Sequence, residues 1–253
     1  MSYVIAVAGK GGTGKTTTTA MIIRYLLNNN KVPILAIDAD PNSNLADSIG
    51  IEVDDSIGGF LGELLRKKID IPQGMSQQSF LEMNLHQILT EKKNIDMLVM
   101  GCPEGPGCYC SANSILKSYF EKLSNNYRYV IIDNEAGMEH FSRKTTMNID
   151  LLLFCSNYSL KGLKTVKRLS DLVDDLRLDV KERYLVVNQT PEILDDDFMK
   201  EVERVGIPFL GNVIKDELLV NSDIKGIPLT ELPDSSVAVK KIDEIMTKFV
   251  DLK

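Results

Sequence analysis

Two lysines and four glycines lie close together in the segment Gly9 to Thr16, which reads GKGGTGKT. This segment follows the apolar run Tyr3 to Ala8 and precedes a helical pattern from Thr17 to Leu27. Glycines let several backbone N–H groups converge on an anion, and the start of the following helix adds its own unpaired amides. The segment therefore predicts a phosphate-binding loop. The alternative is a glycine-rich turn that only joins a strand to a helix.

Within this loop, Lys15 and Thr16 have the side chains that a nucleotide and its metal ion require. A lysine at the position of Lys15 reaches the β- and γ-phosphates, and a hydroxyl at the position of Thr16 binds Mg²⁺. The backbone and side chains around them are expected to contact the phosphates as well. These further contact residues are Gly11, Gly12, Thr13, Gly14 and Thr17.

Carboxylates follow two other apolar runs in the chain. Asp38 and Asp40 come after Val32 to Ile37, in the sequence DADPN, and Asp133 comes after Arg128 to Ile132. Open α/β sheets bind ligands at the carboxyl ends of their strands, so all three acids are expected at one edge. Asp40 would orient the attacking water, Asp38 would hold the Mg²⁺ shell or stay on the lysines, and Asp133 would hold Mg²⁺ through water. The alternative at Asp40 is an Asp-Pro-Asn turn with solvated acids.

Three of the four cysteines fall in the stretch Gly101 to Cys110, which reads GCPEGPGCYC. Its prolines and glycines predict an exposed loop. In an extended segment Cys108 and Cys110 point to the same side, where two thiolates can hold one soft metal ion. A symmetric dimer would complete the ligand set with the same two cysteines of the second chain. Cys102 is a possible further ligand, and the alternatives are buried inert cysteines or a redox pair.

Length and composition limit the classes of function. A chain of 253 residues suits one α/β domain spanning residues 1–253, and 43% hydrophobic with 26% charged residues is ordinary for a soluble protein. The net charge of −7 argues against non-specific nucleic-acid binding. No signal peptide is evident, and the apolar runs are too short to span a bilayer, so no membrane partner is expected. We expect a cytoplasmic protein with reduced cysteines.

The segment Lys10 to Thr16 resembles the deviant Walker A loop, K-G-G-x-G-K-[ST], at every fixed position. This group of ATPases contains MinD, ParA, the nitrogenase iron protein and several metal-cluster chaperones. The resemblance implies a homodimer in which Lys10 touches the nucleotide bound to the opposite subunit, so that Lys10, Lys15 and Asp40 form the catalytic set. The alternative is that Lys10 is a solvated surface lysine.

Two further stretches narrow the resemblance. GPGCYC and DNEAGMEH, together with the loop, resemble the CooC/AcsF group, the nickel-insertion ATPases of carbon monoxide dehydrogenase and acetyl-CoA synthase maturation. The resemblance implies ATP hydrolysis to ADP with Mg²⁺, Ni²⁺ or Zn²⁺ bound by Cys108 and Cys110, a nickel enzyme as the recipient, and dimerisation promoted by ATP or metal. It also implies a γ-phosphate contact for the backbone of Gly137 and an adenine contact for Asn188, which otherwise is a turn-forming residue. His140 would relay switch movement, bind metal or form a local hydrogen bond.

Three other functions remain open from the sequence. An iron–sulfur scaffold ATPase would also use a C-x-C pair and would copurify with a brown cluster. An electron donor similar to nitrogenase reductase needs two separated cluster cysteines in each subunit. A MinD- or ParA-type partitioning ATPase would bind membrane or DNA and would not need the cysteine loop.

The elements that must position these residues follow from the alternation of short apolar runs and helical patterns. This alternation predicts a doubly wound α/β fold with a mainly parallel sheet, of the P-loop NTPase type. Amphipathic helices are expected over 57–68, 77–93, 111–123 and 160–176. A last helix over 234–252 has an apolar stripe that we expect to pack on the domain.

Overall fold

The computed structural model describes residues 2–67, 72–101, 110–135 and 148–250. Within these ranges eight strands form one sheet in the order β3-β4-β2-β5-β1-β6-β7-β8. All neighbouring strands are parallel except β3 and β4. The strands are β1 (Tyr3–Gly9), β2 (Ile34–Ala39), β3 (Thr90–Lys92), β4 (Ile95–Val99), β5 (Tyr129–Asn134), β6 (Ile149–Asn157), β7 (Val180–Thr190) and β8 (Phe209–Ile214).

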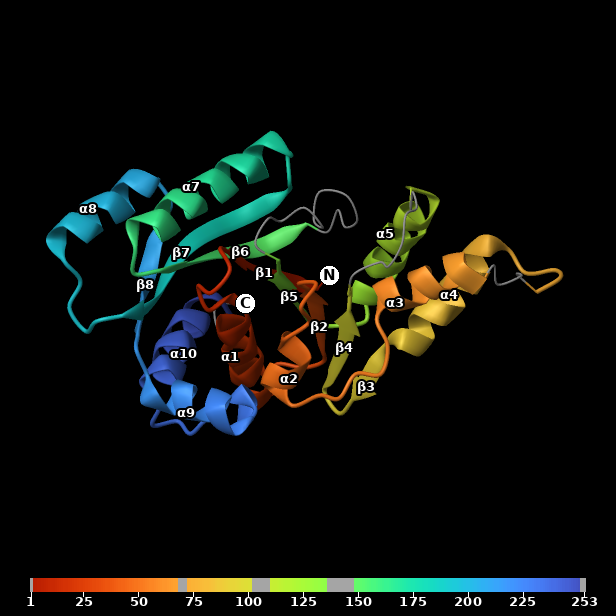
Figure 1. Cartoon of the computed structure of the whole chain (residues 1–253), viewed down its shortest axis with the longest axis horizontal. Coiled ribbons are helices and arrows are strands. Elements are labelled where there is room, and N and C mark those ends of the chain that lie inside the picture. The colour runs from red at the N-terminus through yellow and green to blue at the C-terminus, as the bar shows by residue number, and fades with distance from the viewer. Residues whose placement is uncertain (1, 68–71, 102–109, 136–147, 251–253) are drawn as a thin grey trace.

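Helices cover both faces of the sheet, as the sequence predicted (Figure 1). Those packed on one face are α1 (Lys15–Asn28), α2 (Leu45–Ile49), the 3₁₀ turn η1 (Leu229–Glu231) and α10 (Val237–Val250), with α9 (Glu217–Lys225) beside them. Those on the other face are α3 (Ile57–Lys67), α4 (Gln77–Ile88), α5 (Cys110–Ser124), α7 (Leu160–Asp175) and α8 (Asp196–Val205). The fold is a doubly wound α/β fold.

The central strands are buried on both faces, which explains their continuous apolar runs. In β1, Ile5 and Val7 pack with α1 and α10, whereas Val4, Ala6 and Ala8 pack into the core on the opposite face. Because successive side chains of a strand point to opposite sides, one strand contributes to two separate cores. The sheet is therefore a rigid platform for the loops at its carboxyl edge.

The predicted helix over 77–93 is wrong beyond Ile88. There the chain forms β3, which pairs antiparallel with β4 through Thr90 and Met97. Asn94 turns the chain with a positive φ of 73°, which asparagine tolerates better than most residues. The exposed side chains of Glu91 and Lys92 suit an edge strand, where charge discourages pairing with other molecules.

The helices α8 and α9 begin at aspartate caps for which the sequence had predicted no element. Asp195 accepts hydrogen bonds from the amides of Asp197 and Phe198, and Asp216 accepts one from the amide of Leu218. The last helix begins at Val237 rather than at 234. Its apolar stripe is buried against the domain, as predicted. In the described part of the chain, no helix has the length and apolar character needed to cross a bilayer.

Gly9 fixes how β1 enters the glycine-rich loop. β1 pairs there with β6, and a Cβ on Gly9 would lie 2.3 Å from the carbonyl oxygen of Cys155. Such a contact is far inside van der Waals distance, and both atoms belong to rigid strands. Only glycine therefore lets the two strands run together up to the point where the loop begins.

Gly9→Ala is expected to lower the free energy of unfolding by about 2–3 kcal/mol, because the added methyl group forces backbone atoms apart. Gly11→Ala is the matched control, since a Cβ there meets nothing within 4 Å. It should change stability by less than about 0.5 kcal/mol. Thermal or urea unfolding of both variants measures the difference, and equal stability of the two would contradict the proposed steric role.

Candidate nucleotide site

The glycine-rich loop makes a tight turn just before α1. The hydroxyl of Thr13 donates a 2.7 Å hydrogen bond to the carbonyl of Lys10, and Gly12 and Gly14 have positive φ angles of 76° and 81°. Lys15, the first residue of α1, is 6% exposed, whereas Lys10 is exposed. The two lysines thus have different surroundings, and Lys10 has the freedom to reach another molecule.

The start of α1 has the room and the donors that a phosphate needs. The residue before the helix is Gly14, which has no side chain that could cap it. Among the described residues, no side chain accepts a capping hydrogen bond from the first helical amides. A Cβ built at Gly11 or Gly12 would meet nothing within 4 Å. An open concavity at a positive helix end is a favourable place for an anion. The described residues here fit the phosphates of a nucleotide.

The next residue of the helix connects the loop to β5. Thr16 donates a 2.6 Å hydrogen bond from its hydroxyl to Oδ2 of Asp133, and Thr19 lies 3.3 Å from Oδ1 of the same carboxyl. A threonine hydroxyl and a nearby carboxylate are oxygen ligands of the kind that Mg²⁺ prefers. Thr16 would bind the ion directly and Asp133 through water, which keeps the phosphates and the helix in register.

Two carboxyls of the site are buried next to each other. Asp38 and Asp133 are register partners on β2 and β5, and both are fully shielded from solvent. Burial raises the pKa of Asp133 to about 7; the hydrogen bond from Thr16 opposes this shift and the neighbouring Asp38 adds to it. Burial likewise raises the pKa of Asp38 to about 6. A cation beside this pair would remove much of the cost of ionising it.

Asp38 organises the loop that follows β2. Its Oδ1 accepts a hydrogen bond from the amide of Asp40 at 3.0 Å, and its Oδ2 accepts one from the amide of Leu45 at 2.9 Å. Among the described residues it forms no ion pair with Lys10 or Lys15, so the predicted alternative of a lysine partner is not the arrangement seen. The carboxyl of Asp38 therefore holds the backbone of the loop that contains Asp40.

Asp40 forms an Asx-type turn, as the alternative interpretation of this residue predicts. The turn does not exclude Asp40 from the nucleotide site. Its Oδ1 accepts hydrogen bonds from the amide and the side chain of Asn42, at 3.0 and 2.9 Å. Its Oδ2 has no hydrogen-bond partner among the described residues. The turn and a contact to water are therefore compatible, because they use different oxygens.

Asn188 reaches from the end of β7 to the glycine-rich loop. Its side-chain nitrogen donates to the carbonyl of Thr13 at 2.8 Å and to the hydroxyl of Thr18 at 3.1 Å. A Cβ on Gly14 would lie 2.9 Å from this nitrogen, so glycine is required for the approach. The carbonyl oxygen Oδ1 of Asn188 is buried and has no hydrogen-bond partner in the described part of the chain. A buried acceptor of this kind calls for a donor from a ligand, and the amino group of adenine is such a donor.

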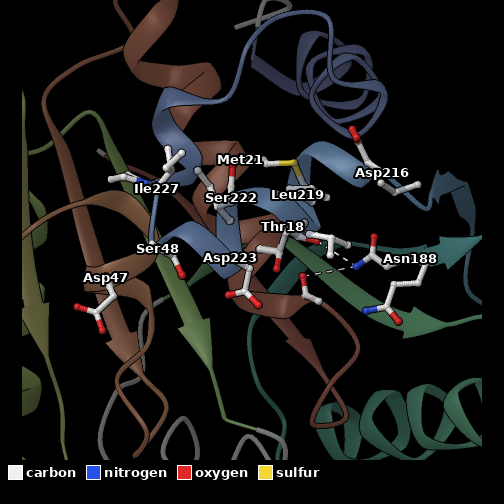
Figure 2. A pocket seen from close by; sticks show the side chains of 18 of the residues that line it. Thr18, Met21, Asp47, Ser48, Asn188, Asp216, Leu219, Ser222, Asp223 and Ile227 are labelled. Atoms are coloured by element: carbon white, nitrogen blue, oxygen red, sulfur yellow. Dashed lines mark hydrogen bonds between the residues drawn. The ribbon is translucent and has the colours of Figure 1, made fainter.

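A cavity of about 1230 Å³ adjoins Asn188 (Figure 2). Gly14 and Thr18 lie on the side of the loop, Val213 on the side of β8, and Leu219 and Ile227 on the side of α9 and the turn after it. Apolar side chains form part of the wall, and polar or charged side chains, Asp216 and Asp223 among them, form the rest.

Sequence reasoning did not identify several of these side chains. Thr18 and Thr19 belong to a run of four threonines, which was a visible signal of polar residues on an otherwise buried helix. Nothing in the sequence of α9 indicates that it lines the cavity, because only the fold brings this helix close to the glycine-rich loop. Cys155 is fully buried, and its Sγ lies 3.6 Å from the Thr18 hydroxyl.

Most of the residues of the predicted nickel or zinc site lie outside the described part of the structure. Cys102, Cys108, Gly137 and His140 lie outside the described residues, and Cys110 is described only as the first residue of α5. Among the residues that the structure describes, no group of three or more His, Cys, Asp or Glu side chains could hold a metal ion. The metal site therefore stays a prediction.

A mainly parallel sheet, a glycine-rich loop before a helix, and acids at neighbouring strand ends define a P-loop nucleoside triphosphatase. The model of the CobQ/CobB/MinD/ParA nucleotide binding domain matches residues 4–229. The chain belongs to this family, and it is an ATPase of the ParA/MinD type.

Similar proteins cover nearly the whole chain. An uncharacterized ATP-binding protein of Methanocaldococcus jannaschii is 40% identical over 99% of both chains. The carbon monoxide dehydrogenase accessory protein CooC of Rhodospirillum rubrum is 29% identical over 90% of this chain and 89% of its own. The septum site-determining protein MinD of Pyrococcus horikoshii, solved with Mg-ADP, superposes with a TM-score of 0.72 at 16% identity, over 100% of this chain and 97% of its own.

Asp133→Asn tests the buried acid pair in the protein without nucleotide. The pKa of Asp133 is higher in the folded than in the unfolded chain, so its contribution to the free energy of unfolding falls as pH rises from about 4 to about 7. Asn removes this effect. The variant should exceed the parent by roughly 1–2 kcal/mol at pH 5 and by roughly 4 kcal/mol at pH 8.

Urea unfolding at the two pH values measures this difference, with Asp54→Asn as a control at an exposed position. The control should differ little from the parent at either pH. A stability difference between Asp133→Asn and the parent that is the same at pH 5 and pH 8 would contradict the account.

Proposed function

We propose that the protein is an ATP-hydrolysing, homodimeric metallochaperone that carries Ni²⁺ or Zn²⁺ on Cys108 and Cys110. Its proposed recipient is a nickel enzyme, carbon monoxide dehydrogenase or acetyl-CoA synthase. Each subunit would act as a single domain over residues 1–253. The 29% identity to a carbon monoxide dehydrogenase accessory protein supports this choice within the family.

The observation that carries the proposal is where the cysteine segment begins. Directly after β4, the amide of Met100 donates a 2.8 Å hydrogen bond to the carbonyl of Asp38, and the carbonyl of Met100 accepts one from the amide of Gly58. The segment 102–110 therefore starts beside the buried acid of the nucleotide site. A change in the backbone at Asp38 on nucleotide binding would reach Met100, two residues before Cys102 in the sequence, through this hydrogen bond.

The proposed chemistry is the attack of water on the γ-phosphate, which releases ADP and phosphate. Lys15 and the amides at the start of α1 would bind the β- and γ-phosphates and stabilise the charge that develops on them. Mg²⁺, held by Thr16 and through water by Asp133, would neutralise the phosphates. The free Oδ2 of Asp40 would orient the water, and Asn188 would receive the adenine amino group at its buried Oδ1.

Lys10 is proposed to act on the nucleotide of the partner subunit. It is exposed, and its side chain forms no ion pair with any residue that the structure describes. A lysine reaching across the interface would add positive charge at the γ-phosphate only when two subunits are closed. Hydrolysis would then depend on dimerisation. The affinity for the metal held between the subunits would depend on the same closure of the dimer.

Mixing two inactive variants tests this action between subunits. In a dimer of one Lys10→Ala and one Lys15→Ala subunit, one site has both lysines and the other has neither. Each parent variant should lose at least about 100-fold in turnover, since each lacks a charge at the transition state. The mixed dimer should recover up to half of the wild-type rate. Verified mixed dimers that show no recovery would argue against the trans contact.

Replacing Cys108 and Cys110 together by Ser tests the metal cargo. Two thiolates per chain leave a soft-metal site half filled, so the parent should bind one ion per dimer, and the double variant should bind none while it still binds ATP. Cys155→Ala is the thiol control, because Cys155 is buried away from solvent. Anaerobic titration with Ni²⁺ or Zn²⁺, combined with mass measurement in solution, gives both stoichiometries.

The same experiment separates the alternatives. One ion per chain on a stable monomer would rule out the shared site. A brown protein with iron and acid-labile sulfide would favour the iron–sulfur scaffold. ATP turnover stimulated by membrane or DNA, without any metal binding, would favour a partitioning ATPase similar to MinD or ParA.

A further inference from the structure

The part of the cavity that lies away from Asn188 is a groove between two helices. One wall is α2 with the segment after it, and the other is α9 with the turn after it. Figure 2 shows Asp47 of α2 at the left, Asp223 of α9 near the centre and Asn188 at the right. We call the part between the two helices the α2–α9 groove, and its lining residues are Asp47, Ile51, Glu52, Val220, Asp223 and Ile227.

Close packing at one end of the groove holds its two walls together. Gly50 ends α2 with a φ of +75°, and a Cβ there would lie 2.7 Å from Cγ of Pro228. The hydroxyl of Thr230 donates a 3.2 Å hydrogen bond to the carbonyl of Ile49, so the segment after α9 is tied to the end of α2. The groove is therefore formed before any ligand binds, which lowers the ordering cost of binding.

Branched apolar side chains of α9 and the turn after it are exposed along this groove. Val220 is 59% exposed, Ile224 is 77% exposed and Ile227 is 40% exposed. Val220 and Ile224 lie one turn apart and so share a face of α9, and Ile227 follows shortly after the last turn. We call these three residues the α9 stripe. An exposed apolar patch of this kind marks a surface that another molecule covers.

The charged side chains of the groove are acidic. Asp47, Glu52 and Asp223 are exposed, and none of them forms an ion pair with a residue that the structure describes. Among the described residues that line the whole cavity, Lys215 is the only lysine or arginine. This charge attracts a cationic ligand, and it repels both nucleic acid and a second copy of this chain, whose net charge is −7.

We propose that the α2–α9 groove docks a basic amphipathic helix of a partner protein. The apolar face of that helix covers the α9 stripe, whose one-turn spacing suits packing against another helix. Its lysines or arginines pair with the three acids of the groove. The apolar contact supplies most of the affinity, and the charges supply orientation and selectivity. This docking surface goes beyond the proposed nucleotide and metal sites and depends on neither.

A synthetic peptide of about 18 residues, with leucines on one helical face and lysines on the other, is the probe. The labelled peptide should bind at about 50 mM NaCl, and its affinity should fall at least about fivefold at about 300 mM NaCl, because the ion pairs are exposed. One control peptide has glutamate in place of every lysine. Another has the same composition in a scrambled order without an apolar face. Fluorescence anisotropy should show weak or no binding of both controls, and equal binding of all three peptides would overturn the proposal.

Val220→Gln combined with Ile224→Gln tests the α9 stripe. Glutamine is a good helix former and removes the apolar contact, so peptide affinity should fall at least about tenfold while the melting temperature stays unchanged. Ile193→Gln is the matched control, because Ile193 is 84% exposed and lies outside the cavity lining. The control should bind the peptide as the parent does. An equal loss of affinity in both proteins, or no loss in either, would contradict the role of the stripe.

Asp47→Asn combined with Glu52→Gln tests the charges. Peptide affinity at low salt should fall at least about fivefold, and its salt dependence should become weaker, because two ion pairs are lost. Glu192→Gln combined with Glu203→Gln is the matched control: both residues are exposed, both lie outside the cavity lining, and the net charge changes by the same amount. The same loss in both double variants would indicate general attraction to an acidic protein and would overturn the groove as the docking site.

Two measurements on Val220→Gln combined with Ile224→Gln separate this docking surface from other uses of the α9 stripe. If the parent self-associates without nucleotide or metal and the variant does not, a second copy covers the stripe, and the proposal is wrong. If the variant loses affinity for Mg-ATP, the stripe belongs to the nucleotide site, and the proposal is also wrong. A parent protein that binds the peptide but no ATP would overturn the proposed function and support this inference.

Discussion

The burial of two carboxyls side by side is the constraint on which the rest of the site depends. Asp38 and Asp133 face each other on neighbouring strands, and no ion pair among the described residues neutralises either of them. The buried lysine Lys15 lowers the pKa of Asp133 only in part, and the balance remains a raised pKa. The folded protein must therefore keep a proton on this pair or accept a cation beside it.

This constraint links the parts of the site to one another. Asp133 receives the hydroxyl of Thr16 and thereby joins β5 to the start of α1. Asp38 fixes the loop that contains Asp40, and its carbonyl holds Met100 at the start of the cysteine segment. A cation and a nucleotide bound beside Asp38 and Asp133 would change the charge of both acids. The loops that are hydrogen-bonded to these two residues would then change their positions as well.

The sequence placed the glycine-rich loop and the acids at one edge of the sheet, and the structure brings them together there, because parallel strands end at one edge and the motif residues are local. Sequence reasoning failed where structure depends on distant contacts. The strand β3 was predicted as the end of a helix, since its three residues have little pattern of their own. The cavity wall from α9 lies about two hundred residues beyond the loop that it faces. The left-handed backbone of Gln189 has no signal in the sequence, because it arises from the pairing of β7 with β8.

Proton release on nucleotide binding tests the role of the buried acid pair most directly. Mg-ADP would be titrated into the protein by calorimetry at pH 6.5 and 8.5, in buffers that differ in ionisation enthalpy. Because the pKa of Asp133 is raised to about 7 and that of Asp38 to about 6, binding should release more protons at pH 6.5 than at pH 8.5, and Asp133→Asn should remove most of the difference. Tight binding at pH 6.5 with no proton released would contradict the account.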